Sequence, residues 1–355
     1  MEIRLWRSSV TIRDAFDAAR QRHEHRERLF LEIDLDSVSG FGEVDPQPGP
    51  LNGDPGIDEV LDELLGLVIP QLRDMVAHEG ALPSWSRLGR LAGPRRASNP
   101  ALALVEMALL ERELRVAGRT VEDLWPPVAA TPLQASASLI GDDEWRVSPD
   151  AARVRVKADP QRLNAGALER LRRLELPVLV DLNCSAQNDD EVVALVSRLS
   201  DMAEIVGVEQ PYAPGNVADH ARLARRLDMA LSIDEGVRSM TDVRQIVRYS
   251  AAQMICVKPA RVGGLANART IVARAREAGL RPYLGGFFES AYARTVHLAL
   301  ARHGIDEPSD LGLVASIEGT ETPEVDLVAG GFGVRPSAEM LERARPVTFF
   351  DGTAI

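Results

Sequence analysis

The chain has 355 residues, of which 45% are hydrophobic and 26% are charged, and this composition is ordinary for a globular protein with room for two domains. Its net charge of −12 argues against a general nucleic-acid or anionic-membrane surface, so neither partner is expected. No apolar run approaches the roughly 20 residues that span a bilayer, the first residues lack a signal-peptide core, and the 2 cysteines show no paired framework. We therefore expect a cytoplasmic protein.

The first 130 residues predict an α+β domain. Residues 1 to about 45 have the pattern of a strand, a polar loop and a second strand, because Leu31–Asp36 alternates apolar and polar side chains. Apolar residues at helical spacing predict one helix over Ile57–Val76 and a more strongly apolar one over Asn99–Val116. The proline-rich segment from Pro126 to Pro132 then predicts a linker.

From Leu133 onward, short apolar strands alternate with helices. This alternation predicts parallel strands that are joined by right-handed crossovers. The connection from Gly141 to Ala152 is too short for a full helix, so the first unit is expected to be abbreviated, and an eighth strand is predicted near Leu311–Ser316. The first seven predicted strands are Leu133–Ile140, Arg153–Val156, Pro177–Val180, Ile205–Val208, Met229–Ile233, Met254–Val257 and Pro282–Gly285.

Polar residues recur at the ends of these strands. Lys157, Asp181, Glu209, Asp234 and Lys258 are separated by 24, 28, 25 and 24 residues, and each follows a short apolar run. One strand and one helix need about this length in a (β/α)8 barrel, in which about 250 residues make eight units. We therefore expect all of them at the C-terminal ends of barrel strands, the face where barrel enzymes place their chemistry.

Lysine occurs at only two positions in the chain, Lys157 and Lys258. Arginine stays charged in proteins, whereas a buried lysine can lose its proton. The alternative interpretation is that an arginine-rich codon bias left these two lysines by chance. We favour titratable amines at a site, because both positions fall on the same predicted face of the barrel.

Asp181, Glu209 and Asp234 would converge in a barrel, because sequential strands are neighbours there. Three carboxylates make an all-oxygen ligand set, which hard divalent ions such as Mg2+ prefer, with Mn2+ as an alternative. Three separate helix caps or surface carboxylates are the competing interpretation. Acids at three consecutive strand ends favour the metal site.

The two lysines indicate proton chemistry beside this metal site. Arg155 and Lys157 are two residues apart on one strand, so their side chains point the same way, and Lys258 follows on a strand roughly across the barrel. Neighbouring positive charge lowers the pKa of a lysine, and a neutral lysine can act as a general base near pH 7. The matching reaction removes a proton next to a carboxylate, because the resulting enediolate needs positive charge beside it.

This spaced set of residues resembles the enolase superfamily, in its muconate-lactonizing-enzyme subgroup, and especially its o-succinylbenzoate synthases and N-acylamino acid racemases. The resemblance covers nearly the whole chain, and the spaced set is specific where any single piece of it is weak. The segments that carry it are Arg155-x-Lys157, Asp181-x-Asn183, Glu209-Gln210-Pro211, Asp234-Glu235, Lys258-Pro259, Gly263-Gly264, Gly285–Ser290 and, nearer the N-terminus, Gly40–Glu43 and Ala103–Ala108 with Leu109.

The resemblance implies an α/β fold, a modified TIM barrel of the (β/α)7β type, over residues 131–320. It implies an N-terminal α+β capping domain over residues 1–130, joined by part of the C-terminal tail, about 320–355. A loop over Phe16–His25 would close over the substrate, a small carboxylate. Relatives of this kind often assemble, so a homo-oligomer is expected.

The resemblance also implies roles for individual residues. Lys157 would be the acid/base on one face of the substrate, and Lys258 would act on the other face, stabilising an enolate in dehydrating members and serving as the second base in racemases. Glu289 and Ser290 would contact substrate or else cap the following helix. The remaining implied roles are Mg2+ ligation by Asp181, Glu209 and Asp234, support of the metal and the lysines by Asn183 and Glu235, and substrate contact by Arg155.

Three departures from the family pattern bear on the substrate. Arg155 stands where the first lysine of a Lys-x-Lys pair is usual, and the connection from Gly141 to Ala152 is short. The final strand end has no clear aspartate, and Glu318 is the candidate to replace it. These departures affect the expected substrate more than the expected class of reaction.

Dehydration of the o-succinylbenzoate-synthase type is the leading hypothesis, with Lys157 removing the α-proton and then assisting the loss of water. The alternatives that use the same site are racemisation or epimerisation of an N-acylamino acid or dipeptide, and muconate-type cycloisomerisation. A barrel that binds an acidic ligand without turnover is a third hypothesis. The intact set of acids and lysines weighs against it.

Overall fold

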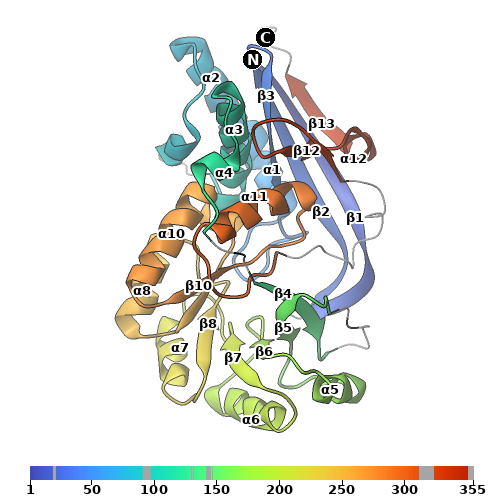
Figure 1. Cartoon of the computed structure of the whole chain (residues 1–355), viewed down its shortest axis with the longest axis vertical. Coiled ribbons are helices and arrows are strands. Elements are labelled where there is room, and N and C mark those ends of the chain that lie inside the picture. The colour runs from blue at the N-terminus through green and yellow to red at the C-terminus, as the bar shows by residue number, and fades with distance from the viewer. Residues whose placement is uncertain are drawn as a thin grey trace.

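The computed structural model describes residues 1–18, 21–90, 97–128, 130, 132–140, 145, 147–311 and 324–350. An antiparallel sheet built from the N-terminal strands lies beside a curved parallel sheet that is surrounded by helices (Figure 1). Within these ranges, none of the helices has the length and apolar character needed to cross a membrane.

The antiparallel sheet has the strand order β13-β1-β2-β3. Its strands are β1 (Glu2–Ala18), β2 (Gln21–Leu35), β3 (Val38–Val44) and β13 (Arg345–Phe350). Leu29, Leu31 and Ile33 are buried, as expected for alternate residues on the covered face of a strand. β13 pairs with β1, so the tail lies in the same sheet as the N-terminal strands. The elements that lead into it are β11 (Val325–Leu327), β12 (Val334–Pro336) and α12 (Ala338–Arg343).

The hairpin between β1 and β2 differs from the expected loop over Phe16–His25. Phe16 pairs with His23, and Ala18 pairs with Gln21, as strand residues of an antiparallel ladder. The prediction of a loop is therefore wrong over these pairs. A polar sequence does not distinguish the two structures, because the ladder is made by backbone groups and needs no apolar side chains.

The helices of the N-terminal domain follow the apolar periodicity of the sequence. The predicted helix over Ile57–Val76 forms as α1 (Ile57–Glu63), a π-helical segment (Leu64–Val68) and α2 (Ile69–Glu79). The second predicted helix is α3 (Asn99–Val116), which begins after an extended Ser98 and carries Pro100 in its first turn. A 3-10 helix (Trp85–Arg90) and α4 (Val121–Leu124) complete the set in this part of the described chain.

Strand β3 and helix α3 approach each other at two glycines. A Cβ atom on Gly42 would lie 2.1 Å from Leu104 O, and a Cβ atom on Gly40 would lie 2.2 Å from Ala108 O. Both contacts are with backbone, which cannot rotate away as a flexible side chain can. Only glycine therefore lets the sheet and the helix pack at this distance.

We expect Gly42→Ala to destabilise the protein by about 1–3 kcal/mol, the usual cost of inserting an atom into a packed core. The measurement is the free energy of unfolding in urea. Gly49→Ala is the matched control, because a Cβ atom on Gly49 meets nothing within 4 Å. Equal stability of the two variants would contradict the close approach of β3 and α3.

The parallel sheet has the order β10-β9-β8-β7-β6-β5-β4, so strands that are consecutive in the chain are neighbours in space. All seven predicted strands are found, with shifted ends. They are β4 (Leu133–Ser138), β5 (Ala151–Lys157), β6 (Val178–Asp181), β7 (Ile205–Glu209), β8 (Ala230–Ile233), β9 (Met254–Val257) and β10 (Arg281–Leu284).

Helices cover the outside of this sheet (Figure 1). In α6, buried residues recur at helical spacing at Val192, Leu195, Val196 and Leu199, which gives the helix one apolar face for the barrel. The described residues between β4 and β5 form no helix, as the short connection predicts. The helices are α5 (Ala165–Arg172), α6 (Asp189–Ser200), α7 (Val217–Ala224), α8 (Met240–Tyr249), α9 (Pro259–Val262), α10 (Leu265–Glu277) and α11 (Ala291–Arg302).

Ser309 and Asp310 join the two edges of the parallel sheet. The backbone carbonyl of Ser309 accepts the N–H of Gln134 on β4 (3.0 Å), and the backbone N–H of Asp310 donates to Leu284 O on β10 (2.9 Å). These two residues therefore take the eighth position of the barrel. The predicted eighth strand, Leu311–Ser316, begins after them and lies outside the described residues from 312 onward.

Carboxylates of the N-terminal domain cap two barrel helices. Glu106 of α3 accepts the backbone N–H groups of Leu265 and Ala266 at the start of α10, the second at 2.9 Å. Glu43 of β3 accepts the backbone N–H of Ser290 at the start of α11 (2.6 Å) and also its hydroxyl (2.5 Å). Negative charge is favourable at a helix N-terminus, so these contacts hold the N-terminal domain against the barrel.

Candidate active site

Strand register places several predicted site residues side by side. Lys157, Asp181 and Glu209 are Cα partners across β5, β6 and β7. Glu209 in turn pairs with Ser232 on β8. Because alternate residues of a strand share a face, Asp234 lies on the same side as Ser232. The structure therefore brings these carboxylates and Lys157 to one end of the barrel.

The three predicted metal ligands, Asp181, Glu209 and Asp234, are buried. Each carboxylate contacts a cation. Arg155 Nη1 lies 3.3 Å from Asp181 Oδ2 and 3.0 Å from Glu209 Oε1, and Lys258 Nζ donates to Asp234 Oδ2 at 3.0 Å. Buried charges need such partners, because desolvation is costly for an ion that is left alone.

Lys157 extends into the site from the end of β5. Its Nζ donates to Asn183 Oδ1 (2.9 Å) and lies 3.5 Å from Asp181 Oδ2. Burial lowers the pKa of Lys157, and the charges of Arg155 and Lys258 lower it further, against an opposing effect of Asp181. The amine is therefore shifted toward the neutral form that a general base needs.

Lys258 follows β9 and has a different environment. Its Nζ forms an ion pair with Asp234 at 3.0 Å and lies 4.8 Å from the centre of the Phe287 ring. Burial lowers the pKa of Lys258, but the charge of Asp234 more than offsets this, so the pKa is raised overall. Gly285 leaves room for the side chain, since a Cβ atom there would lie 2.9 Å from Lys258 Cε.

The carboxylates fit a hard divalent cation. Glu209, Asp234 and Cys256 offer ligand atoms that all lie within 4.8 Å of one another. Asp181, the third predicted ligand, is not part of this group, and its Oδ2 is a buried oxygen that accepts no hydrogen bond. A thiolate would favour a softer metal, and burial raises the pKa of the Cys256 thiol well above its usual range. The two carboxylates of the group are the ligands that suit a hard cation.

Asn183 and Glu235 support the ligands from the adjoining loops. Asn183 donates its backbone N–H to Asp181 Oδ1 (3.0 Å) and its amide to Glu235 Oε1 (3.4 Å), and Asn52 donates to the same Glu235 oxygen (3.3 Å). Asn183 and Gln210, which follow ligand-bearing strands, have positive φ values of 41° and 37°. Non-glycine residues in this conformation concentrate at functional sites.

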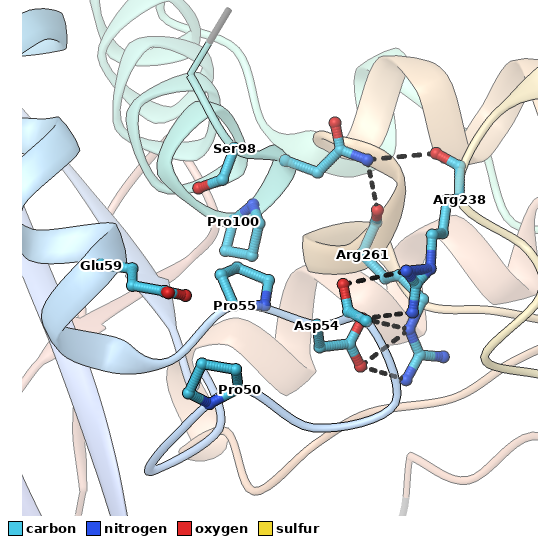
Figure 2. A pocket seen from close by; sticks show the side chains of 10 residues that line it. Pro50, Asp54, Pro55, Glu59, Ser98, Pro100, Arg238 and Arg261 are labelled. Carbon is cyan, nitrogen blue, oxygen red and sulfur yellow. Dashed lines mark hydrogen bonds and ion pairs between the residues drawn. The ribbon is translucent and has the colours of Figure 1, made fainter. Parts of the chain in front are cut away.

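Arg261 was not identified from the sequence, and it connects the site to the N-terminal domain. Its Nη1 donates to Asp234 Oδ1 (2.5 Å), and its Nη2 donates to Asp54 Oδ2 (2.7 Å). Arg238 reaches the same loop by donating to Gly53 O (2.9 Å). Asp54 forms ion pairs with both arginines, and Figure 2 shows it beside them. The loop around Asp54 is thereby tied to a predicted metal ligand.

Arg238 and Arg261 also line a pocket of about 370 Å3 (Figure 2). It is lined by the loop from Pro50 to Pro55, by the start of α3 at Ser98 and Asn99, and by Arg238 and Arg261. Neither Lys157 nor Lys258 is among its lining residues. The candidate active site is therefore assigned from the lysines and carboxylates and not from this pocket.

Asp310 is a second residue that the sequence interpretation missed. Arg155 Nη2 donates to Asp310 Oδ2 at 2.8 Å. The sequence predicts no clear aspartate at the end of the final strand, and Asp310 lies just before the predicted strand Leu311–Ser316. Glu318, the candidate to replace it, lies outside the described residues.

Glu289 and Ser290 are both buried and have protein partners. Glu289 Oε2 accepts the backbone N–H of Phe287 (2.8 Å) and lies 3.7 Å from Arg294 Nη2. Ser290 Oγ accepts the backbone N–H of Tyr292 (3.1 Å) and so caps α11. The structure gives them loop-holding and helix-capping contacts, and substrate contact by either one stays a prediction.

Known proteins resemble this chain in sequence, and solved structures resemble it in fold. o-Succinylbenzoate synthase from Bacillus subtilis (strain 168) is 26% identical over 313 residues, which cover 84% of this chain and 81% of that protein. N-succinylamino acid racemase from Amycolatopsis sp is 25% identical over 353 residues, 92% of each chain. The solved structure of N-succinyl Arg/Lys racemase from Bacillus cereus ATCC 14579 aligns with a TM-score of 0.81 at 15% identity and covers 98% of this chain and 99% of that one.

These structural neighbours confirm the predicted fold class, a modified barrel with an N-terminal capping domain. The sequence model of the family described as enolase C-terminal domain-like matches residues 144–336, which include all five lysine and carboxylate positions predicted from the strand ends. The chain therefore belongs to the enolase C-terminal domain-like family, within the enolase superfamily.

Proposed function

We propose that this protein is a Mg2+-dependent enzyme that removes a proton α to a carboxylate, and that its reaction is a dehydration of the o-succinylbenzoate-synthase type. The observation that carries the proposal is the difference between the two lysines. Lys157 donates to the neutral amide of Asn183 and has a lowered pKa, whereas Lys258 is ion-paired with Asp234 and has a raised pKa. An amine whose pKa is lowered, opposite an amine that is held in an ion pair, suits a reaction with a single proton-transfer base.

Asp181, Glu209 and Asp234 would hold the metal, which is Mg2+ or alternatively Mn2+. Asp181 is the last residue of β6, Glu209 is the last residue of β7, and Asp234 follows β8 directly. When bound, the metal supplies positive charge beside the substrate carboxylate, which stabilises the negative charge that develops as the α-proton leaves. The hydrogen bonds of Asn183 to Asp181 and of Lys258 to Asp234 would orient these ligands.

The lysines would then divide the proton chemistry. Neutral Lys157 Nζ takes the α-proton, and the electron pair of the broken C–H bond moves toward the carboxylate. The ammonium of Lys258 stabilises that charge. As the C–O bond to the leaving hydroxyl breaks, protonated Lys157 returns its proton to that oxygen. The products are an alkene and water, and Lys157 is neutral again.

Racemisation of an N-acylamino acid is the second candidate. The Amycolatopsis racemase aligns over 92% of both chains, and Lys258 provides a second amine at the site. This reaction requires Lys258 to release a proton, which its ion pair with Asp234 opposes. It therefore ranks below dehydration. Cycloisomerisation ranks lower still, although chloromuconate cycloisomerase from Cupriavidus pinatubonensis is 26% identical over 298 residues.

The test is conversion of the o-succinylbenzoate precursor, with N-succinylamino acids offered in parallel. We expect ultraviolet absorbance to report o-succinylbenzoate in Mg2+ and no conversion after chelation with EDTA. Restoration by Mg2+ controls for damage during chelation. Inversion of the amino acids, measured on a chiral column without conversion of the precursor, would replace dehydration by racemisation. Turnover that survives EDTA would contradict the metal site.

A further inference from the structure

Arg155 stands at the centre of the carboxylates. Its Nη1 donates to Glu209 Oε1 at 3.0 Å and lies 3.3 Å from Asp181 Oδ2, and its Nη2 donates to Asp310 Oδ2 at 2.8 Å. The side chain is 7% exposed. Both terminal nitrogens of the guanidinium are therefore committed to carboxylates of the protein.

Asp310 holds Nη2 of this guanidinium, whereas Nη1 contacts Glu209 and Asp181. Its backbone N–H donates to Leu284 O on β10 (2.9 Å), and its carboxylate also accepts the hydroxyl of Ser136 on β4 (3.4 Å). The adjacent Ser309 accepts a backbone hydrogen bond from β4. Asp310 is thus held by the segment that closes the barrel, and it holds Arg155 in turn.

A guanidinium can donate five hydrogen bonds, but the donors of Arg155 are not arranged for a substrate. The terminal nitrogens have protein acceptors, and Nε is buried without a hydrogen-bond partner. A substrate carboxylate that took either of these two hydrogen bonds would displace Glu209 or Asp310. Displacement would leave a buried carboxylate without its cation, which is unfavourable.

We propose that Arg155 is a positioning residue, a fixed counter-cation of the metal ligands, and that Asp310 sets how strongly it binds them. The proposal rests on the metal site of the proposed function. It replaces the expectation that Arg155 contacts substrate. A monovalent cation beside Asp181 and Glu209 stabilises these buried acids, and it also repels a divalent cation that shares them.

The two residues should therefore shift metal affinity in opposite directions. Arg155→Met removes the competing charge, so we expect the dissociation constant for Mg2+ to fall at least about fivefold, while the melting temperature of the chelated protein falls. Asp310→Asn frees Arg155 to bind Glu209 and Asp181 more strongly. We expect this variant to raise the dissociation constant several-fold, and the backbone hydrogen bond of residue 310 is kept.

The experiment is isothermal titration calorimetry with MgCl2 and thermal melting in EDTA, on the wild type, Arg155→Met, Asp310→Asn and the double variant. Arg155→Lys, which keeps the charge, should bind Mg2+ more like the wild type than Arg155→Met does. The effect of Asp310→Asn should vanish when Arg155 is absent, because Asp310 acts on the metal ligands through its contact with Arg155. If Arg155→Met does not fold, the sign of the Asp310→Asn effect still decides.

Unchanged Mg2+ affinity in both single variants, or weaker affinity in Arg155→Met, would overturn the inference. A raised KM for the substrate with unchanged Mg2+ affinity in Arg155→Met would restore a substrate-binding role. A wild-type protein that binds no Mg2+ would overturn the metal site of the proposed function, and the inference with it. If the wild type binds Mg2+ and the variants bind it with the same dissociation constant, the inference about Arg155 is overturned and the metal site of the proposed function stands.

Discussion

Lys157→Ala is expected to lower turnover by roughly a hundredfold to ten-thousandfold, the usual contribution of a positioned general base. The expectation follows from the environment of Nζ. It lies 2.9 Å from Asn183 Oδ1 and 3.5 Å from Asp181 Oδ2, and burial lowers the pKa of the amine. The measurement is kcat/KM for the o-succinylbenzoate precursor at saturating Mg2+.

Lys157→Arg is the control that separates charge from proton transfer. Arginine places a fixed positive charge beside Asp181 and does not deprotonate in proteins, so it cannot take the α-proton. We expect this variant to be as inactive as Lys157→Ala when Mg2+ is saturating. Activity of Lys157→Arg close to that of the wild type would show that the residue supplies charge and that the base is elsewhere.

Asp234→Asn is expected to abolish Mg2+ binding and to destabilise the fold. Asp234 is buried and accepts hydrogen bonds from Lys258 Nζ (3.0 Å) and Arg261 Nη1 (2.5 Å). An asparagine would leave two buried cations without their shared anion. Removing one partner of a buried ion pair costs about 3–5 kcal/mol. Calorimetric titration with Mg2+ and urea unfolding measure the two effects separately.

Glu235→Gln is the matched control, because Glu235 is a buried carboxylate next in sequence. Its Oε1 accepts hydrogen bonds from Asn52 and Asn183 at 3.3 Å and 3.4 Å. In the proposed site Glu235 supports the ligands without holding the metal. We expect Glu235→Gln to keep Mg2+ binding within about tenfold of the wild type, at the smaller end of what such supporting residues cost. Mg2+ binding by Asp234→Asn that equals the wild type would contradict the ligand assignment.

Local patterns predicted the elements that carry the chemistry. The strands β5 to β9 each have a short apolar run with a polar residue at or just after the end, and parallel neighbours align those ends. The register of Lys157, Asp181 and Glu209 across β5 to β7 is a direct consequence. Helix α3 was predicted with its observed ends because its apolar spacing and its proline start are local features of the sequence.

Contacts between distant segments could not be predicted in the same way. Asp54 and Arg261 are 207 residues apart, and Arg155 and Asp310 are 155 apart. Nothing in the residues around Asp54 indicates an arginine partner, since the surrounding loop is rich in proline and glycine. The barrel closure at Ser309 and Asp310 has no apolar run, so periodicity did not indicate it. The homo-oligomer expected from the resemblance stays a prediction.

Removal of the α-proton is the central claim, and it is shared by dehydration and racemisation. Its most direct test is Mg2+-dependent loss of deuterium from α-deuterated precursor and α-deuterated N-succinylamino acids, followed by NMR for the wild type and Lys157→Ala. We expect the wild type to release the label from at least the precursor and Lys157→Ala to release it from neither. Retention of the label by the wild type in both, or equal release by Lys157→Ala, would contradict the account.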